Sequence, residues 1–259
     1  MSGLLQAIDV SFAYGAQAVL RGVSVDVQAG RITALLGPNG SGKSTLIKVL
    51  MGHLRASGQV LCDGRPVSRW PARKLARLVA YLPQFPAHEV GQTVAQVIAL
   101  GRAPYLGAFG IESAEDAKVV REVAAALQLE EMLDRPVDEL SGGQRQRVFI
   151  GRCLAQRPRA LLLDEPTSSL DLRHQVELMR LLKDLATKDG LAILMASHDL
   201  NLAGMFADRL VLLHEGKVAA EGPADAVLRP EVLSGVYGVG MERIERGGGV
   251  PVVVPRVMP

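Results

Sequence analysis

A glycine-rich stretch near the N-terminus constrains the fold of this chain more than any other feature. It fits the pattern G-x-x-x-x-G-K-[ST], and it reads Gly37-Pro38-Asn39-Gly40-Ser41-Gly42-Lys43-Ser44-Thr45. The apolar run 32–36 before it predicts a buried strand, and residues 46–50 after it predict a helix. Glycines let backbone N–H groups converge on one point, and the start of the helix adds its positive dipole end there. The stretch therefore predicts a phosphate-binding loop.

Two side chains of this loop carry most of its expected chemistry. Lys43 would bring a full positive charge to the β- and γ-phosphates of a nucleotide, and the Ser44 hydroxyl could bind Mg²⁺. The alternative is an ordinary glycine-rich turn before a helix. All the fixed positions of the pattern are present in a strand–loop–helix setting, which argues against that alternative.

The composition limits the remaining possibilities. The chain has 259 residues, 48% of them hydrophobic, which is enough for a sizeable core in one large or two small domains. Its 29 basic and 27 acidic residues give a net charge of +2, so no general attraction to nucleic acid is expected. Cys62 and Cys153 match no metal or redox spacing and are expected to be buried in a reducing compartment. No signal peptide and no apolar run of about 18 residues are found, which predicts a cytoplasmic protein that could still dock on a membrane protein.

Strand patterns dominate the N-terminal part of the chain. Residues 4–27 predict antiparallel strands, because valines alternate with polar residues over 23–27, and 58–67 predict a short hairpin around an Asp-Gly turn. The apolar run 78–82 predicts another strand, and Gln84 follows it directly. Ligands of open parallel sheets bind at the carboxyl ends of the strands, so Gln84 could reach the phosphates. A solvated loop glutamine fits this position equally well.

Helical patterns replace strand patterns between about residues 86 and 158. Ser113 can cap a helix with two acidic residues in its first turn, and apolar residues then recur at helical spacing. We expect a helical subdomain inserted into the nucleotide-binding core. Within it, residues 101–107 predict a loop with exposed aromatic and basic groups, which is either a partner surface or an ordinary loop.

A second anion-binding pattern follows at residues 140–147. Ser141 can cap the next helix, expected at 148–156, while Gly142 and Gly143 expose backbone N–H groups. Since the chain already has one phosphate loop, this second anion-binding site suggests that it binds the nucleotide of another copy of the chain. The alternative is a simple capped helix start.

Two further strands are predicted to end in functional side chains. The apolar run 161–163 leads into Asp164 and Glu165, which we expect to anchor Mg²⁺ and to orient or deprotonate a water molecule. The run 191–196 leads to His198, which would lie near the γ-phosphate if its strand joins the same sheet. Surface carboxylates and a structural histidine are the alternatives. A helix predicted from about residue 168 ends at Gly190.

Taken together, these motifs resemble the nucleotide-binding subunit of ATP-binding cassette (ABC) transporters over essentially the whole chain. The most specific element is Leu140-Ser141-Gly142-Gly143-Gln144, the family signature. The resemblance implies an α/β fold with a P-loop NTPase, RecA-like core, an N-terminal antiparallel β subdomain and an inserted α-helical subdomain. Residues 1–259 would form a single ABC ATPase domain. Its β subdomain and core would comprise 1–85 and 159–259, and its helical signature subdomain 86–158.

The resemblance also implies ATP and Mg²⁺ as cofactors and assigns site residues. Nucleotide-binding residues would be Tyr14, Gly37, Pro38, Asn39, Gly40, Ser41, Gly42, Lys43, Ser44, Thr45, Ser141, Gly142, Gly143, Gln144 and Asp171. Ligands of the metal would be Ser44, Gln84 and Asp164. Residues acting in catalysis would be Glu165 as the general base, His198 as the γ-phosphate contact, Lys43 and Gln84.

Two of these assignments rest on the resemblance alone. Tyr14 occupies the place where the family stacks an aromatic ring on adenine, although a tyrosine beside a glycine is usually surface packing. Asp171 resembles the loop residue that communicates across the family's dimer.

Family members act as head-to-tail dimers with ATP held between the phosphate loop of one subunit and the signature of the other. This implies a homodimer, transmembrane permease subunits and an extracytoplasmic substrate-binding protein as partners, at the cytoplasmic face of the plasma membrane. Softer likenesses, such as residues 99–105 and 168–175, resemble importers of iron(III)-siderophores, cobalamin and haem. The alternative is a non-transport ABC ATPase of chromosome maintenance or iron–sulfur assembly. The short spacer between phosphate loop and signature argues against the chromosome type.

Overall fold

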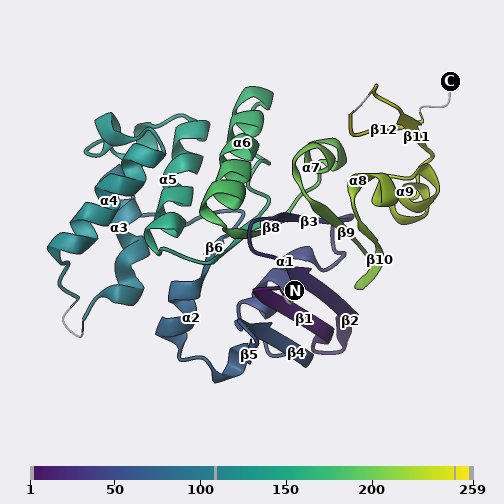
Figure 1. Cartoon of the computed structure of the whole chain (residues 1–259), viewed down its shortest axis with the longest axis horizontal. Coiled ribbons are helices and arrows are strands. Elements are labelled where there is room, and N and C mark those ends of the chain that lie inside the picture. Colours follow the sequence, from purple (N-terminus) through teal and green to yellow (C-terminus); the bar gives the residue numbers. More distant parts are fainter. Residues whose placement is uncertain (1–2, 108–109, 248, 257–259) are drawn as a thin grey trace.

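A six-stranded sheet lies at the centre of the computed structural model, which describes residues 3–107, 110–247 and 249–256 (Figure 1). Its strand order is β10-β9-β3-β8-β7-β6, and all neighbours are parallel except the β9–β10 hairpin. The bounds are β3 Ile32–Leu36, β6 Val79–Leu82, β7 Ala160–Asp164, β8 Ala192–Ala196, β9 Arg209–His214 and β10 Lys217–Gly222. Strands β3, β7 and β8 are buried along their whole length, as expected for apolar runs covered on both faces.

A second, antiparallel sheet is formed by the N-terminal part of the chain, with the order β2-β1-β4-β5. Its bounds are β1 Leu5–Tyr14, β2 Gln17–Val27, β4 Ser57–Cys62 and β5 Arg65–Pro66. Val23, Val25 and Val27 of β2 are buried while the residues between them are more exposed. The alternation that predicted this strand therefore marks the face that packs on helix α1 and the central sheet.

Helices surround the central sheet and fill the long connection between β6 and β7. The α-helices are α1 Lys43–Leu50, α2 Ala72–Leu78, α3 Val94–Ala99, α4 Ala114–Ala126, α5 Gly142–Ala155, α6 Leu172–Asp189, α7 Leu200–Phe206, α8 Ala224–Val227 and α9 Pro230–Tyr237. Short 3-10 helices are η1 Val67–Arg69, η2 Leu100–Tyr105, η3 Glu130–Met132 and η4 Val137–Glu139. Helices α3, α4 and α5 pack against one another at one end of the molecule (Figure 1).

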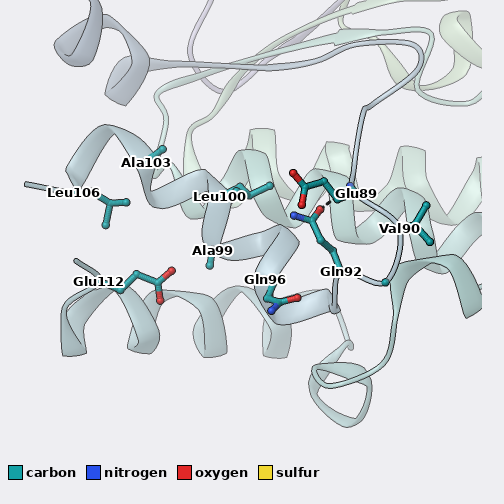
Figure 2. A pocket seen from close by; sticks show the side chains of 10 residues that line it. Glu89, Val90, Gln92, Gln96, Ala99, Leu100, Ala103, Leu106 and Glu112 are labelled. Atoms are coloured by element: carbon teal, nitrogen blue, oxygen red, sulfur yellow. Dashed lines mark hydrogen bonds between the residues drawn. The ribbon is translucent and has the colours of Figure 1, made fainter. Parts of the chain in front are cut away.

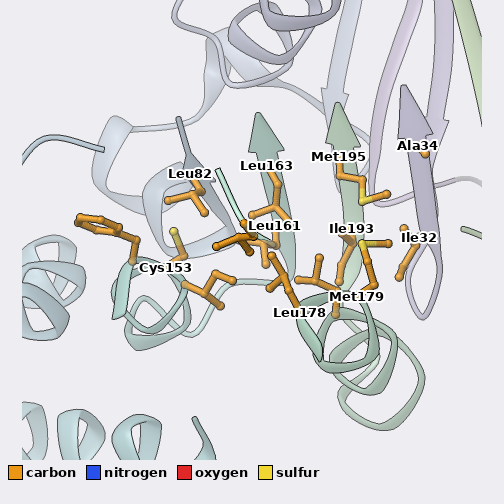
Figure 3. Close-up of a cluster of buried hydrophobic side chains, with 14 of the residues drawn as sticks. Ile32, Ala34, Leu82, Cys153, Leu161, Leu163, Leu178, Met179, Ile193 and Met195 are labelled. Atoms are coloured by element: carbon orange, nitrogen blue, oxygen red, sulfur yellow. The ribbon is translucent and has the colours of Figure 1, made fainter. Parts of the chain in front are cut away.

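The core on one face of the central sheet joins these parts of the chain. Side chains from four neighbouring strands meet helices α5 and α6 there (Figure 3), and the labelled ones are Ile32, Ala34, Leu82, Cys153, Leu161, Leu163, Leu178, Met179, Ile193 and Met195. Cys62 lies in the core on the other face. Both cysteines are free and buried, which confirms the prediction that they act as apolar core residues.

The segment 101–107 was predicted wrongly as an exposed loop. Residues 100–105 form the 3-10 helix η2, and Arg102 is only 3% exposed. Arg102 Nε donates to Asp116 Oδ1 at 2.8 Å, and its guanidinium lies 3.7 Å from the centre of the Tyr105 ring. Tyr105 in turn donates its hydroxyl to the backbone of Gln156. Distant partners on α4 and α5 bury these groups, and the local pattern contained no sign of them.

Elements near strand ends and at the C-terminus also differ from those that the sequence patterns predicted. Leu78, expected in a strand, ends helix α2, and α9 was not predicted. The apolar tail pairs as β12 Val252–Pro255 with β11 Met241–Ile244. Within the described parts of the chain, no helix is both long and apolar enough to cross a membrane.

Candidate active site

The glycine-rich loop connects β3 to α1, as its pattern predicted. Gly37, Gly40 and Gly42 have φ angles of 139°, 78° and 107°, which side chains other than glycine rarely adopt. A Cβ atom on Gly37 would lie 2.1 Å from the carbonyl oxygen of Leu213 at the end of β9. The end of β9 therefore lies so close to the loop at Gly37 that only glycine fits there.

Lys43, the first residue of α1, points back over this loop. Its Nζ donates to the carbonyl oxygens of Gly37 at 2.7 Å and Pro38 at 3.1 Å. The side chain is largely buried, and burial lowers the pKa of Lys43, while the charges of Glu165 and Asp164 oppose that shift. The ammonium group is thus held by weak carbonyl acceptors, which a phosphate oxygen can replace.

Ser41 and Ser44 present hydroxyl groups in the same region. The Ser41 hydroxyl is buried and has no hydrogen-bond partner among the described residues. Ser44 Oγ donates to Asp164 Oδ1 at 3.0 Å, which connects the start of α1 to the end of β7. Burial raises the pKa of Asp164, and the hydrogen bond from Ser44 opposes that rise. A buried, poorly solvated carboxylate beside a hydroxyl is a favourable setting for a hard cation.

Glu165 is the centre of a small polar cluster at the carboxyl ends of three strands. It follows β7 with a φ of 53°, a strained conformation for a residue other than glycine. Gln84, after β6, donates its side-chain amide to Glu165 Oε2 at 2.5 Å. Nε2 of His198, after β8, is in close contact with Glu165 Oε1. Both carboxylate oxygens of Glu165 are therefore engaged by side chains that the sequence analysis had selected.

The signature turn, Ser141–Gln144, forms the start of α5. The Ser141 hydroxyl accepts from the backbone N–H of Gln144 at 3.3 Å, and Gln144 Oε1 accepts from the backbone N–H of Ser141 at 3.1 Å. Ser141 and Gly142 remain exposed. Across the part of the chain that is described, no hydrogen bond or ion pair joins this turn to residues 37–45. The turn is thus a capped helix start with two exposed residues.

Tyr14 and Asp171 lie at the surface. Tyr14 is 49% exposed and packs edge-on against Phe12, with ring centres 4.8 Å apart. Asp171 caps α6 by accepting from the backbone N–H of His174 at 2.9 Å. Both positions leave a face free for contact with another molecule.

Three residues near the site were not selected from the sequence. Tyr81 lies beside Asp164; burial raises the pKa of Tyr81 to about 12, and the Asp164 carboxylate adds to the rise. The buried hydroxyl of Tyr237 lies close to the phosphate loop; burial raises its pKa to about 12, and the Gly37 backbone N–H opposes the rise. Ser168 Oγ donates to the Glu165 carbonyl oxygen at 3.1 Å. These residues belong to strands, loops and a C-terminal helix that only the fold brings together.

A profile of the ABC transporter family matches residues 20–168. The chain belongs to this family. The fold class predicted from the ABC resemblance is confirmed, and membership makes the chain an ATP-binding, ATP-hydrolysing subunit.

Relatives of this ABC subunit include proteins with assigned transport systems. The hemin import ATP-binding protein HmuV of Rhodococcus jostii (strain RHA1) is 42% identical over 254 residues, covering 97% of this chain and 86% of that protein. The iron(3+)-hydroxamate import ATP-binding protein FhuC of Bacillus subtilis (strain 168) is 37% identical, covering 92% of this chain and 89% of that protein.

Solved ABC structures show the same likeness. A transporter of the metal-chelate type in an inward-facing conformation superposes with a TM-score of 0.86 at 27% identity, over 98% of both chains. The dimeric bacterial cassette MJ0796 superposes with a TM-score of 0.74 at 28% identity, over 85% of this chain and 98% of that one.

Proposed function

We propose that this ABC ATPase drives an importer of a metal chelate of the iron-siderophore, haem or cobalamin type. Two copies would close head to tail on two ATP molecules and transmit the closure to a membrane permease. The hemin and hydroxamate import functions of its relatives support the cargo class. They disfavour the alternative of a non-transport ABC ATPase in chromosome maintenance or iron–sulfur assembly.

The engagement of Glu165 by Gln84 and His198 is the observation that carries the catalytic part of this proposal. Three separate strands bring these side chains to one edge of the sheet, where open α/β sheets bind their ligands. The phosphate loop adjoins the same edge, because β3 is the neighbour of β8. A carboxylate held there is placed to accept a proton from water that attacks a γ-phosphate.

Each residue near the phosphates would have one task. Lys43 exchanges its two carbonyl acceptors for phosphate oxygens, and the backbone N–H groups of the loop surround the β-phosphate. The Ser41 hydroxyl, buried in the loop and without a hydrogen-bond partner among the described residues, gains an acceptor when a phosphate arrives. Glu165 orients the water and receives its proton. His198, held against Glu165, contacts the γ-phosphate and supports the charge that develops on it.

The residues around Asp164 fit a magnesium ion. Ser44 and Asp164 already meet at 3.0 Å, and the side-chain amide of Gln84 bonds to Glu165, the residue after Asp164. Among the described residues there is no group of three or more His, Cys, Asp or Glu side chains that could hold a metal ion by itself. Hydroxyl, carboxylate and amide oxygens suit Mg²⁺, which usually also takes substrate phosphates as ligands. Bound there, the ion would neutralise part of the charge on the β- and γ-phosphates.

The signature turn, Ser141–Gln144, supports the proposal of a homodimer. Ser141 and Gly142 are exposed, and among the described residues no hydrogen bond joins the turn to the phosphate loop of the same chain. A head-to-tail partner would bring a nucleotide to this turn, and Tyr14 and Asp171 would then have their exposed faces at the same interface. The dimeric cassette among the similar structures is consistent with this arrangement.

A groove of about 470 Å³ in the helical segment is the proposed contact with the permease. The residues that line it are Glu89, Val90, Gly91, Gln92, Gln96, Ala99, Leu100, Ala103, Leu106 and Glu112 (Figure 2). Val90 is 94% exposed and Leu100 is 48% exposed, a poor arrangement in water unless an apolar partner covers them. The segment leads directly from Gln84 to this groove, so a cytoplasmic helix of the permease seated there could move the Gln84 side chain.

The remaining partners follow from the same importer proposal. Binding to the permease would hold the chain at the cytoplasmic face of the plasma membrane. An extracytoplasmic substrate-binding protein would deliver the chelate on the opposite side. The nearly balanced charge offers no support for a nucleic acid partner.

The substitution Glu165→Gln tests the catalytic proposal. We expect phosphate release to fall by about 10²-fold or more, because a general base is lost, while ATP binding measured by calorimetry persists. The control is Glu221→Gln, which removes a carboxylate paired with Arg209 in the β9–β10 hairpin. Turnover at the wild-type rate in Glu165→Gln would show that the assigned base is wrong.

The transport proposal needs a separate measurement. A permease that co-purifies with this chain should raise its ATP turnover when the chelate and its binding protein are added. Val90→Asp should abolish co-purification without changing the turnover of the isolated subunit. A chain that co-purifies with chromosomal or iron–sulfur assembly proteins instead would favour the alternative function.

A further inference from the structure

The signature helix α5 and the helix α6 are neighbours whose N-terminal ends both carry residues of the proposed dimer interface. The two helices are neighbours in the fold (Figure 1); α5 begins with the signature turn, and α6 begins after Asp171. Side chains join the first two turns of these helices. The residues involved are Gly143 and Arg147 on α5, and His174 and Glu177 on α6.

His174 is fixed in place by Asp171. The Oδ1 atom of Asp171 accepts both from the His174 backbone N–H at 2.9 Å and from His174 Nδ1 at 2.7 Å. One carboxylate oxygen thus caps the helix and orients the imidazole. The ring is therefore part of the Asp171 turn and lacks the freedom of a surface side chain.

The other edge of the imidazole lies against the second glycine of the signature turn. A Cβ atom on Gly143 would lie 2.3 Å from His174 Cδ2 and 2.9 Å from His174 Nε2. The backbone of Gly143 is buried, although Ser141 and Gly142 before it are exposed. The His174 imidazole therefore packs directly against the buried part of the signature turn.

A second contact repeats the connection one turn further along both helices. Arg147 Nη2 bonds to Glu177 Oε2 at 2.8 Å, and Arg173 Nε bonds to Glu177 Oε1 at 2.9 Å. The Arg173 hydrogen bond lowers the pKa of Glu177, with Arg147 acting in the same direction, so the carboxylate remains charged at neutral pH. Two successive contacts resist both sliding and rotation of α5 relative to α6.

The same end of α6 is also tied to Glu165. Gln175 donates its side-chain amide to the carbonyl oxygens of Thr167 at 3.2 Å and Leu170 at 3.0 Å. Ser168 then bonds to the Glu165 carbonyl oxygen at 3.1 Å. A continuous set of contacts thus runs from the signature turn through His174 and the Asp171 loop to the general base of the same chain.

From this arrangement we infer that His174, supported by the Arg147–Glu177 pair, is a positioning residue that couples the two ATP sites of the dimer. The inference rests on the proposed dimer, in which the signature turn serves the partner's ATP and Glu165 serves the chain's own ATP. When the signature turn binds the partner's nucleotide, a change in the position of the turn moves His174. His174 in turn moves the loop that carries Glu165 at the chain's own nucleotide. Neither His174 nor Glu177 touches ATP in this scheme.

The first test uses ATP-induced dimerisation in the Glu165→Gln background, where ATP is trapped. We expect His174→Ala to weaken the dimer at least tenfold in sedimentation, while the affinity of the monomer for ADP changes less than twofold. Glu177→Gln, which leaves the histidine intact, should weaken the dimer in the same direction. Arg159→Ala is the control. It removes the ion pair with Asp63, which at 2.8 Å has the same length as the Arg147–Glu177 pair but does not join α5 to α6.

The second test measures the coupling between the two ATP sites directly. With Glu165 intact, His174→Ala should lower the Hill coefficient for ATP hydrolysis from near two toward one, a change that general loss of stability would not produce. If Glu165→Gln dimerises with ATP and both variants leave dimer affinity and the Hill coefficient unchanged, the role of His174 is wrong and the dimer stands. If Glu165→Gln itself stays monomeric with ATP, the dimer proposal and this inference both fail.

Discussion

The side-chain amide of Gln84 donates a 2.5 Å hydrogen bond to Oε2 of Glu165, 81 positions later in the chain. The bond connects the end of an outer strand, β6, to the residue after β7, and Gln84 is followed by the segment that lines the groove of Figure 2. A shift of that segment would change the orientation of the Glu165 carboxylate. The pair thus connects a surface groove with the site where we place the general base.

Gln84→Ala should therefore lower kcat more than it affects nucleotide binding. A hydrogen bond to a charged group contributes about 1.5–3 kcal/mol, so its loss predicts a decrease in kcat of roughly 10- to 100-fold. Phosphate release and calorimetric ATP affinity, measured on the isolated subunit, separate the two effects. Gln92→Ala is the control, because it removes a side chain that accepts from the Glu89 backbone N–H and has no contact with Glu165 among the described hydrogen bonds. Equal kcat values in the two variants would contradict the role of Gln84.

Ser141→Ala should abolish most ATP turnover although it costs little stability. Ser141 and Ser113 each form a complete capping box, at the starts of α5 and α4. Losing either hydroxyl should lower the free energy of unfolding by about 1 kcal/mol. Only Ser141 belongs to the proposed nucleotide interface, so only its variant should lose hydrolysis while the monomer still binds ATP. Denaturant unfolding and phosphate release on both variants test this, and equal activities would remove the signature turn from the site.

Lys43→Ala should weaken nucleotide binding itself. The ammonium group lies over the phosphate loop, and its hydrogen bonds within the described residues go to two backbone carbonyls. Loss of a charged contact to phosphate predicts an affinity for ATP lower by roughly 10- to 100-fold. Lys118→Ala removes an exposed lysine from helix α4, which pairs with Glu122, and should bind ATP normally. A fluorescent-nucleotide titration measures both variants, and unchanged affinity in Lys43→Ala would exclude it from the phosphate site.

Asp116 should make the helical segment sensitive to acid. Hydrogen bonds from the Ser113 side chain and backbone, and then from Arg102, lower the pKa of Asp116 to about 2, below its ordinary value of 3.8. The folded protein thus binds fewer protons here than the unfolded chain. Its stabilising contribution is complete above about pH 4 and is lost as the pH falls toward 2. Urea unfolding between pH 5 and 2 should show this loss, and Asp116→Asn should reduce it.

Arg102→Met provides a complementary measurement at neutral pH. Both partners of the Arg102–Asp116 pair are almost fully buried, so removing the arginine leaves a buried carboxylate without its counter-charge. We expect a loss of about 3–5 kcal/mol in the free energy of unfolding. A double variant with Asp116→Asn should recover part of that loss. A stability equal to wild type would show that the pair is solvated in solution.

Much of the site was predictable because its parts are local in sequence. The phosphate loop, the capped start of α5 and the carboxylates after β7 each depend on a few consecutive residues and on the strand or helix beside them. Their residue types therefore identified them before the strand order was known. Glu165 and His198 could be selected as strand-end residues, although the contact between them could not.

The errors came from residues whose neighbours are distant in the sequence. Arg102 and Tyr105 have the composition of an exposed loop, yet Asp116 and Gln156 supply charged and backbone partners that make burial favourable. His174 lies in a segment selected only for its likeness to importers. Its contact with Gly143 depends on the packing of α6 beside α5, which no periodicity in either helix specifies.

The sequence by itself determined which segments form the glycine-rich loop, cap helices and form buried strands, because backbone conformation and apolar periodicity are set by adjacent residues. Only the tertiary structure decided which strand ends meet, which charges are buried and which helix supports the signature turn. Those outcomes depend on the packing of segments tens of residues apart, where geometry selects the partners for each polar group.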